Sequence, residues 1–293
     1  MSLDTETEYV RVCLYGEYGT GKTSALAAAA ELGEVHIIDT EQRLKAGPLR
    51  RLGIDTTRIE PFRDITFNAI LDYLWSIKEL IHDEPGRVAA VGIDTMEDLV
   101  KTFIATIIDE SSASLLAAAK RRGEIVKINP LEVPDDGYNL MTEQVRRIFR
   151  LLRDLDCHLM FTSHERRDKD GDGRLRIGPS ASPAVQADLM GYVDILGHTG
   201  YDEGVFVARF EPGTKFAAKD TFGLLPHVMV NPTLPRIVGY VSGKLTREND
   251  PPQLAYDTLV AERFAEATQS AQATAAAEVA GRTPRRRRGS EST

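Results

Sequence analysis

Residues 16–23, with the sequence GEYGTGKT, constrain the fold of this chain more than any other segment. They match the pattern G-x-x-x-x-G-K-[ST], in which glycines let the backbone turn tightly so that amide groups point at phosphate oxygens. A β-branched and aromatic run at residues 9–15 precedes the motif, and an Ala- and Leu-rich run at residues 22–32 follows it. We therefore expect a strand, a phosphate-binding loop and a helix, with a chance Gly-rich turn as the alternative. The residues expected around a nucleotide are Gly16, Glu17, Tyr18, Gly19, Thr20, Gly21, Lys22, Thr23 and Ser24.

Three side chains are predicted to hold the triphosphate and its metal. Lys22 is expected to reach the β- and γ-phosphates, and Thr23 to bind Mg²⁺ through its hydroxyl. Asp94 ends the apolar run VAAVGID, which places it at the carboxyl edge of a parallel sheet, where ligands bind in such folds. We predict that Asp94 completes the magnesium site; an Asp that only caps the next helix is the alternative.

Hydrolysis also needs a group that orients and deprotonates the attacking water. Glu97 follows Asp94 by three positions and falls inside an expected helix, so we interpret it as a solvated or capping residue. Glu41 comes just after the expected strand EVHIID, and from that strand end its carboxylate can face the γ-phosphate. Glu41 is therefore the predicted catalytic carboxylate, and an ordinary surface carboxylate is the alternative.

Apolar periodicity predicts alternating strands and helices through residue 163. The expected strands lie at residues 9–15, 34–39, 87–94 and 157–162, and the expected helices at residues 22–32, 65–81, 97–109 and 139–155. This alternation indicates an α/β fold with a mostly parallel sheet flanked by helices. Residues 194–199, 204–210 and 235–241 are short strand candidates between Gly and Pro turns, which predict hairpins toward the C-terminal side.

Composition changes predict three regions along the chain. Residues 1–245 are expected to form the core, residues 246–280 an Ala- and Glu-rich helical extension, and residues 281–293 a disordered basic tail. We find no secretion signal and no apolar run long enough to span a bilayer, so a cytoplasmic protein without membrane contact is expected. Cys13 and Cys157 lie in strand-like runs and are expected to be reduced core residues.

The order of the segments GEYGTGKT, HIIDTEQRL, VAAVGIDT and HLMFTSHERR resembles the ATPase core of RecA-like recombinases. The likeness covers residues 8–240, and the chain looks most similar to core-only RecA-like proteins of phages, described as AAA-domain ATPases or Sak-group single-strand annealing proteins. The phosphate-loop motif is common to many ATPases. Glu41, the strand end Ser163-His164 and the segment KFAAKD at residues 215–220 are together more specific.

The resemblance implies a RecA-like P-loop core that uses ATP and Mg²⁺, with ATP bound between the subunits of a homo-oligomer. It implies that Glu41 is the catalytic carboxylate and that His164 senses the γ-phosphate, while Lys215 and Lys219 reach a neighbour's ATP. Without the resemblance, these lysines would be interpreted as a solvated basic turn. Because residues 1–8 alone precede the first expected strand, the N-terminal polymerisation arm of bacterial recombinases is not expected, and a ring or short oligomer is as consistent as a filament.

Two segments are expected to contact single-stranded DNA in such a protein. Residues 111–137 contain Lys120, Arg121, Arg122 and Lys127, and residues 165–190 contain Arg166, Arg167, Lys169, Arg174 and Arg176. The net charge of −8 restricts any nucleic-acid contact to local basic patches of this kind. For the second segment a solvated charged hairpin is the alternative, because Asp168, Asp170 and Asp172 lie among its cations. The basic run at residues 285–288 could bind nucleic acid or serve solubility alone.

The activity implied is DNA-stimulated ATP hydrolysis in phage recombination, annealing or replication. An ATPase with a protein client, such as an assembly or packaging factor, is one alternative. A nucleotide-gated DNA-annealing protein with negligible turnover is another. No guanine-reading N-K-x-D motif is evident in the sequence, which favours ATP over GTP.

Overall fold

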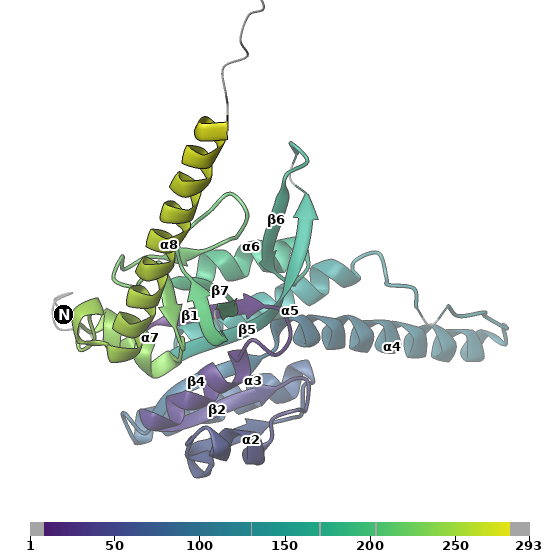
Figure 1. Cartoon of the computed structure of the whole chain (residues 1–293). Helices are drawn as coiled ribbons and strands as arrows, with labels where there is room; N and C mark the ends of the chain where they lie inside the picture. The colour runs from purple at the N-terminus through teal and green to yellow at the C-terminus, as the bar shows by residue number, and fades with distance from the viewer. Residues whose placement is uncertain (1–8, 130, 170, 203, 282–293) are drawn as a thin grey trace, which may run out of the picture. The chain divides into compact units, whose positions relative to one another are not determined.

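A computed structural model describes residues 9–281 except residues 130, 170 and 203. The chain divides into two units, Met1–Thr246 and Arg247–Thr293, and Figure 1 labels the elements of both. The sheet of the first unit has the strand order β10-β8-β7-β1-β5-β4-β2-β3, with β6 paired to β5 and β9 to β7. Its strands are β1 (Arg11–Gly16), β2 (Glu34–Asp39), β3 (Ile59–Phe62), β4 (Val88–Asp94), β5 (His158–Lys169), β6 (Leu175–Pro179), β7 (Ile195–Asp202), β8 (Val205–Arg209), β9 (Lys219–Asp220) and β10 (Val228–Val230). The helices are α1 (Lys22–Ala27), η2 (Ala28–Glu31), α2 (Ala46–Arg51), η3 (Thr56–Arg58), α3 (Phe67–Asp83), α4 (Met96–Arg122), α5 (Gly137–Arg153), α6 (Pro183–Tyr192) and α7 (Leu234–Val241).

The centre of the sheet is parallel, as expected from the alternation of strands and helices. β1 pairs in parallel with β5 and β7, and β4 pairs in parallel with β2 and β5. The register places Gly16 opposite His164 and Asp39 opposite Asp94. The strand ends that carry the predicted site residues therefore lie at the same edge of the sheet.

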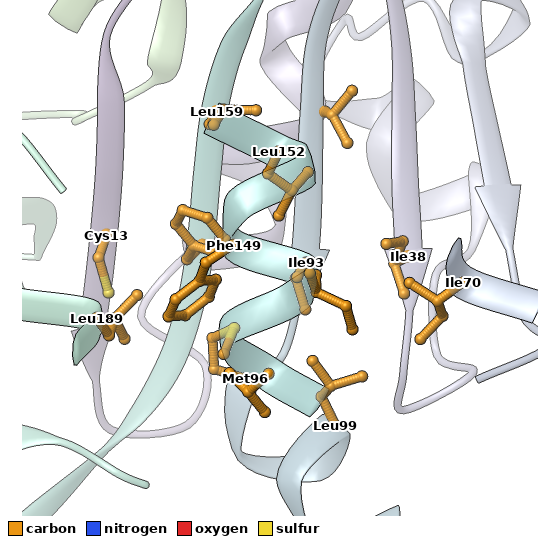
Figure 2. Close-up of a cluster of buried hydrophobic side chains, with 14 of the residues drawn as sticks. Cys13, Ile38, Ile70, Ile93, Met96, Leu99, Phe149, Leu152, Leu159 and Leu189 are labelled. Carbon is orange, nitrogen blue, oxygen red and sulfur yellow. The ribbon is translucent and has the colours of Figure 1, made fainter. Parts of the chain in front are cut away.

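Each face of the sheet has its own hydrophobic core. Along β1, Cys13 and Tyr15 belong to one core while Val12 and Leu14 belong to the other, because successive side chains of a strand point to opposite faces. Helices α3, α4, α5 and α6 cover the first face, and α1, α2 and α7 cover the second. Figure 2 shows the first core, where Ile93 of β4 and Phe149 of α5 lie among the labelled side chains.

The two cysteines are free and buried, which confirms their predicted place in the core. Burial raises the pKa of the Cys157 thiol to about 12, and it raises the pKa of Cys13 as well. Both thiols are therefore protonated at neutral pH and are unsuited to nucleophilic chemistry.

α4 is much longer than the helix expected at residues 97–109, and it includes residues 111–122, the first part of a segment that was expected to contact DNA. Residues 113–122, ASLLAAAKRR, favour a helix by intrinsic propensity, although most side chains after Ile107 leave the core. Gly123, with a φ of 67°, ends the helix. By length and composition α4 could cross a membrane. This is weak evidence, because core helices share both properties and Met96 and Phe103 of α4 pack in the core.

Residues 235–241 lie in α7, so the strand expected there is wrong. Their β-branched composition favours a strand, but Pro235 fits the first turn of a helix. Leu234, Ile237 and Tyr240 are buried at helical spacing. The antiparallel edge expected near this region does exist, because β8 pairs with β7 on one side and with β10 on the other.

Residues 165–190, the second segment expected to contact DNA, contain a β-hairpin and a helix. β5 continues beyond the sheet to Lys169 and pairs antiparallel with β6, from Glu165 opposite Pro179 to Lys169 opposite Leu175. α6 follows directly after this hairpin. Figure 1 shows the β5–β6 hairpin projecting from the sheet. A solvated charged hairpin was the alternative considered for this segment.

The second unit contains η4 (Arg247–Asn249) and α8 (Pro251–Gly281). Within this unit Arg247 Nη2 lies 2.7 Å from Asp257 Oδ2. The helical extension expected at residues 246–280 corresponds to α8. The basic tail expected at the C-terminus lies, from residue 282 onward, outside the described residues.

Candidate nucleotide-binding site

The loop between β1 and α1 has the conformation that its glycines permit. Gly19 and Gly21 have φ values of 75° and 77°, in the left-handed region that favours glycine. Gly16 lies so close to β7 that a Cβ atom built on it would be 2.4 Å from Thr199 O. Thr199 Oγ1 also lies 2.8 Å from Thr20 Oγ1, which ties the loop to β7.

Lys22 is buried beneath this loop. Its Nζ donates to Gly16 O at 3.0 Å and to Glu17 O at 2.7 Å. Burial lowers the pKa of the ammonium, and the nearby carboxylates of Asp94 and Glu41 oppose that shift. Lys22 therefore places a positive charge inside the loop, where a phosphate chain would lie.

Thr23 and Asp94 meet at the mouth of the loop. Thr23 Oγ1 donates to Asp94 Oδ2 at 2.7 Å, and the Thr162 hydroxyl of β5 donates to the other carboxylate oxygen. Burial raises the pKa of Asp94, while the two hydroxyl donors lower it. The carboxylate at the end of β4 is thus held toward the phosphate loop, so Asp94 is more than a helix cap.

The donor set fits Mg²⁺ bound to a triphosphate. Mg²⁺ takes oxygen ligands and is commonly bound by one or two protein groups together with phosphates and waters. A hydroxyl from Thr23 beside a carboxylate from Asp94 is the protein pair found in P-loop enzymes. Among the described residues no cluster of three or more His, Cys, Asp or Glu side chains could hold a metal by itself.

Glu41 and His164 lie side by side near the phosphate loop. His164 Nε2 lies 3.0 Å from Glu41 Oε1, and Thr95 Oγ1 donates to the same oxygen at 3.4 Å. Arg43 Nη1 lies 3.3 Å from the second oxygen, Oε2. The ring of Tyr18 packs over the ring of His164, with 3.8 Å between their centroids. The predicted catalytic carboxylate and the predicted sensor are therefore in direct contact.

The turn that presents Glu41 is fixed by Asp39, which the sequence did not single out. Asp39 is 1% exposed. Its carboxylate accepts from Arg43 N at 3.0 Å, from Leu44 N at 3.2 Å and from Arg63 Nε at 3.0 Å. The signal was present, because Asp39 ends an apolar strand as Asp94 does.

These residues enclose a cleft of about 440 Å³. Its lining brings together five of the predicted residues that carry chemistry, namely Lys22, Thr23, Glu41, Asp94 and His164. Tyr18, Gly19, Thr20, Gly21 and Ser24 also line it. Glu17 instead points toward the base of the β5–β6 hairpin, where its Oε1 lies 2.6 Å from Arg167 Nη2.

The two lysines assigned by resemblance lie outside this cleft. Lys219 Nζ donates to Val193 O at 2.7 Å within its own chain. Lys215 lines a second cavity of about 440 Å³, on the side of the phosphate loop that Glu17 and Arg167 share. Its Nζ lies 5.1 Å from the centre of the Phe216 ring. Neither lysine lines the candidate nucleotide-binding cleft.

Several cations of the two segments expected to contact DNA are paired with acids. Arg166 Nε lies 2.8 Å from Asp168 Oδ2, and Arg167 Nη2 lies 2.7 Å from Glu165 Oε1. Lys120, Arg121 and Arg122 lie in the last turn of α4, where cations interact favourably with the helix dipole. Part of the charge in both segments is therefore explained by the fold itself.

The comparison with known families agrees with this geometry. The model of a family described as an AAA domain matches residues 8–222, well over half of the chain. No curated protein matches the chain. The matched residues include the phosphate loop, both acidic strand ends and His164. The chain therefore belongs to the AAA domain family of nucleotide-binding ATPases.

Proposed function

We propose that this protein binds and hydrolyses ATP as a RecA-like ATPase and acts on single-stranded DNA in phage recombination, annealing or replication. One observation carries the catalytic part of the proposal. Lys22, the Thr23–Asp94 pair and the Glu41–His164 pair converge on one cleft at the carboxyl edge of the sheet. A site that hydrolyses a triphosphate needs three kinds of group: a cation that binds the phosphates, oxygen ligands for the metal, and a base that orients and deprotonates the water.

The nucleotide spans two adjoining cavities in this proposal. The triphosphate lies in the cleft of about 440 Å³, and a neighbouring cavity of about 240 Å³ receives the base. The two cavities share Thr20, Gly21, Ser24 and Phe206. Ala25 and Ile54 supply apolar walls to the second cavity, and Asn231 supplies an amide that can recognise a base edge.

Each chemical group has a defined task in the reaction. Lys22 binds the phosphate chain, and Thr23 with Asp94 would hold Mg²⁺, which would neutralise phosphate charge. Glu41 orients the attacking water and accepts its proton. His164 fixes Glu41 and is joined through the backbone of β5 to the β5–β6 hairpin, so it links the nucleotide cleft to the hairpin.

The β5–β6 hairpin supports single-stranded DNA as the partner. It begins directly after His164 and carries Arg166, Arg167, Lys169 and Arg176. Such side chains bind phosphates without reading sequence. In the same proposal ATP lies between the subunits of a homo-oligomer, and Lys215 and Lys219 extend to a neighbour's nucleotide. Lys219 must then give up its hydrogen bond to Val193 O.

ATP hydrolysis measured with no polymer, single-stranded DNA, double-stranded DNA and RNA tests the proposal. We expect the rate to rise with single-stranded DNA, and we expect Lys22→Ala to abolish turnover under every condition. A protein without ATPase activity under any condition contradicts the catalytic part. An ATP hydrolysis rate that none of the three polymers changes favours an ATPase with a protein client instead. Strand annealing that proceeds equally in Glu41→Gln favours a nucleotide-gated annealing protein.

A further inference from the structure

Both carboxylate oxygens of Glu41 have partners. Oε1 is contacted by His164 Nε2 at 3.0 Å and by Thr95 Oγ1 at 3.4 Å. Oε2 faces Arg43 Nη1 at 3.3 Å. A guanidinium at Oε2 competes with a water that would donate to the same oxygen. To act as a base, Glu41 needs one of these partners to leave.

Arg43 is the partner that can leave at least cost. Its side chain is 76% exposed, whereas those of Glu41 and His164 are 15% and 12% exposed. Because the Arg43 guanidinium is already largely in solvent, it regains little hydration and loses little packing when it leaves Glu41, so breaking the contact costs little. The backbone of Arg43 is nevertheless fixed, because its N–H donates to the buried Asp39 at 3.0 Å. A mobile guanidinium on a fixed backbone can move between two nearby partners.

The cleft offers the second partner when a triphosphate is bound. Among the described residues that line it, Lys22 and Arg43 are the only lysine or arginine residues, and Lys22 lies beneath the loop. A terminal phosphate brings more charge and more acceptor oxygens than one carboxylate oxygen at 3.3 Å. The planar guanidinium can bind such a phosphate with two parallel hydrogen bonds.

We propose that Arg43 moves from Glu41 to the terminal phosphate of the bound nucleotide and is a catalytic residue of the same subunit; this rests on the ATPase function proposed above. In the reaction the water oxygen bonds to the γ-phosphorus, and the bond from that phosphorus to the β–γ bridging oxygen breaks. The electron pair leaves with ADP, and the water proton goes to the vacated Oε2 of Glu41. Arg43 forms no covalent bond and stabilises the charge on the transferred phosphoryl group.

The test uses the full chain and three variants: Arg43→Ala, Arg43→Lys and Arg51→Ala. Arg51 is an exposed arginine of α2 that does not line the cleft, so it is the matched control. We expect Arg43→Ala to lower kcat on the order of 10³-fold with ADP affinity retained, as for other arginines that contact a transferred phosphoryl group. Arg43→Lys should recover little, because lysine lacks the planar fork, and added guanidinium should restore part of the lost rate in Arg43→Ala. Arg51→Ala should match the wild type.

A kcat for Arg43→Ala close to that of the wild type overturns the proposal, and so does an equal loss in Arg51→Ala. If the wild-type protein hydrolyses no ATP, the proposed function fails and the Arg43 contact is tested by binding alone. Wild type is then expected to prefer a non-hydrolysable ATP analogue over ADP, and Arg43→Ala should lose that preference. A preference that survives in Arg43→Ala overturns the contact. Melting curves check that each variant folds. Because the Arg43 side chain is exposed, we expect Arg43→Ala to melt at the same temperature as wild type.

Discussion

His164 Nε2 lies 3.0 Å from Glu41 Oε1, so β5, at the point where its pairing with β1 ends, is joined directly to the turn after β2. Both side chains are largely buried, at 12% and 15% exposure. The Nδ1 atom of His164 is buried without a hydrogen-bond partner among the described residues. His164 is therefore held by its contact with Glu41 and by packing against Tyr18.

His164→Ala is expected to reduce kcat on the order of 10²-fold, because a catalytic group that loses its orientation loses rate to about this extent. ATP affinity should stay close to wild type, since Lys22 and the loop amides are untouched. Stimulation by single-stranded DNA should disappear as well. His227→Ala, which changes an exposed histidine that lies next to Glu211, is the control. Equal stimulation in His164→Ala and wild type would contradict the link to the hairpin.

Asp94→Asn should separate stability from activity. Burial raises the pKa of this carboxyl, so its charge is costly in the folded protein without a metal. Removing the charge is expected to leave the free energy of unfolding unchanged or to raise it by about 1 kcal/mol at neutral pH. Turnover should fall below detection. Urea unfolding and ATPase assays check this, and a strongly destabilised Asn variant would show that the carboxylate is needed for the fold.

Gly16→Ala should damage both the fold and the site. The added methyl would lie 2.4 Å from Thr199 O, a backbone atom that cannot move aside easily. Overpacking of this kind costs about 1–3 kcal/mol of unfolding free energy. Gly191→Ala is the matched control, because a Cβ at Gly191 in α6 meets nothing within 4 Å. Equal urea midpoints for the two variants would contradict the close approach of loop and β7.

His158 should make stability fall on acidification. Burial lowers its pKa from 6.5 to about 4, and its Nδ1 accepts from Val10 N at 3.2 Å. A lowered histidine pKa means that the unfolded chain binds the proton more readily, so this contribution is present above pH 6.5 and is lost as pH falls to about 4. His158→Gln keeps an acceptor without titrating. Its urea midpoint should therefore vary less between pH 7 and pH 5 than that of wild type; equal variation would exclude His158 as a source.

The sequence predicts this site better than it predicts the periphery of the fold. Apolar strand runs are local signals in the sequence, and Gly16–Thr23, Glu41, Asp94 and His164 each lie at the end of such a run or shortly after it. Parallel pairing of the strands brings these positions to the same edge of the sheet. Thr162 was not predicted because its contact with Asp94 joins β5 to β4, two strands that are distant in sequence and pair only in the folded sheet. Arg43 lies only two residues from Glu41, but nothing in its local sequence distinguishes it from an ordinary solvated arginine.

The differences between the predicted and the observed elements have physical causes. The distal half of α4 lies outside the core, so apolar periodicity vanishes there while helix propensity persists. In α7 intrinsic propensity and burial disagree in the other direction. Its β-branched residues favour a strand, but its buried residues follow helical spacing on a helix that begins with Leu234 and Pro235. In β5, charged residues extend the strand beyond the sheet, where β6 supplies the missing backbone partners.

In the proposed reaction Glu41 acts on the water, while Lys22 and the loop bind the nucleotide. ATP binding and steady-state ATP hydrolysis, both measured on Glu41→Gln, separate these two roles, with Lys22→Ala as the variant that should lose turnover. We expect Glu41→Gln to bind ATP as tightly as wild type and to lose hydrolysis by about 10²- to 10⁴-fold, the contribution of a general base. Hydrolysis by Glu41→Gln at the wild-type rate would contradict the account.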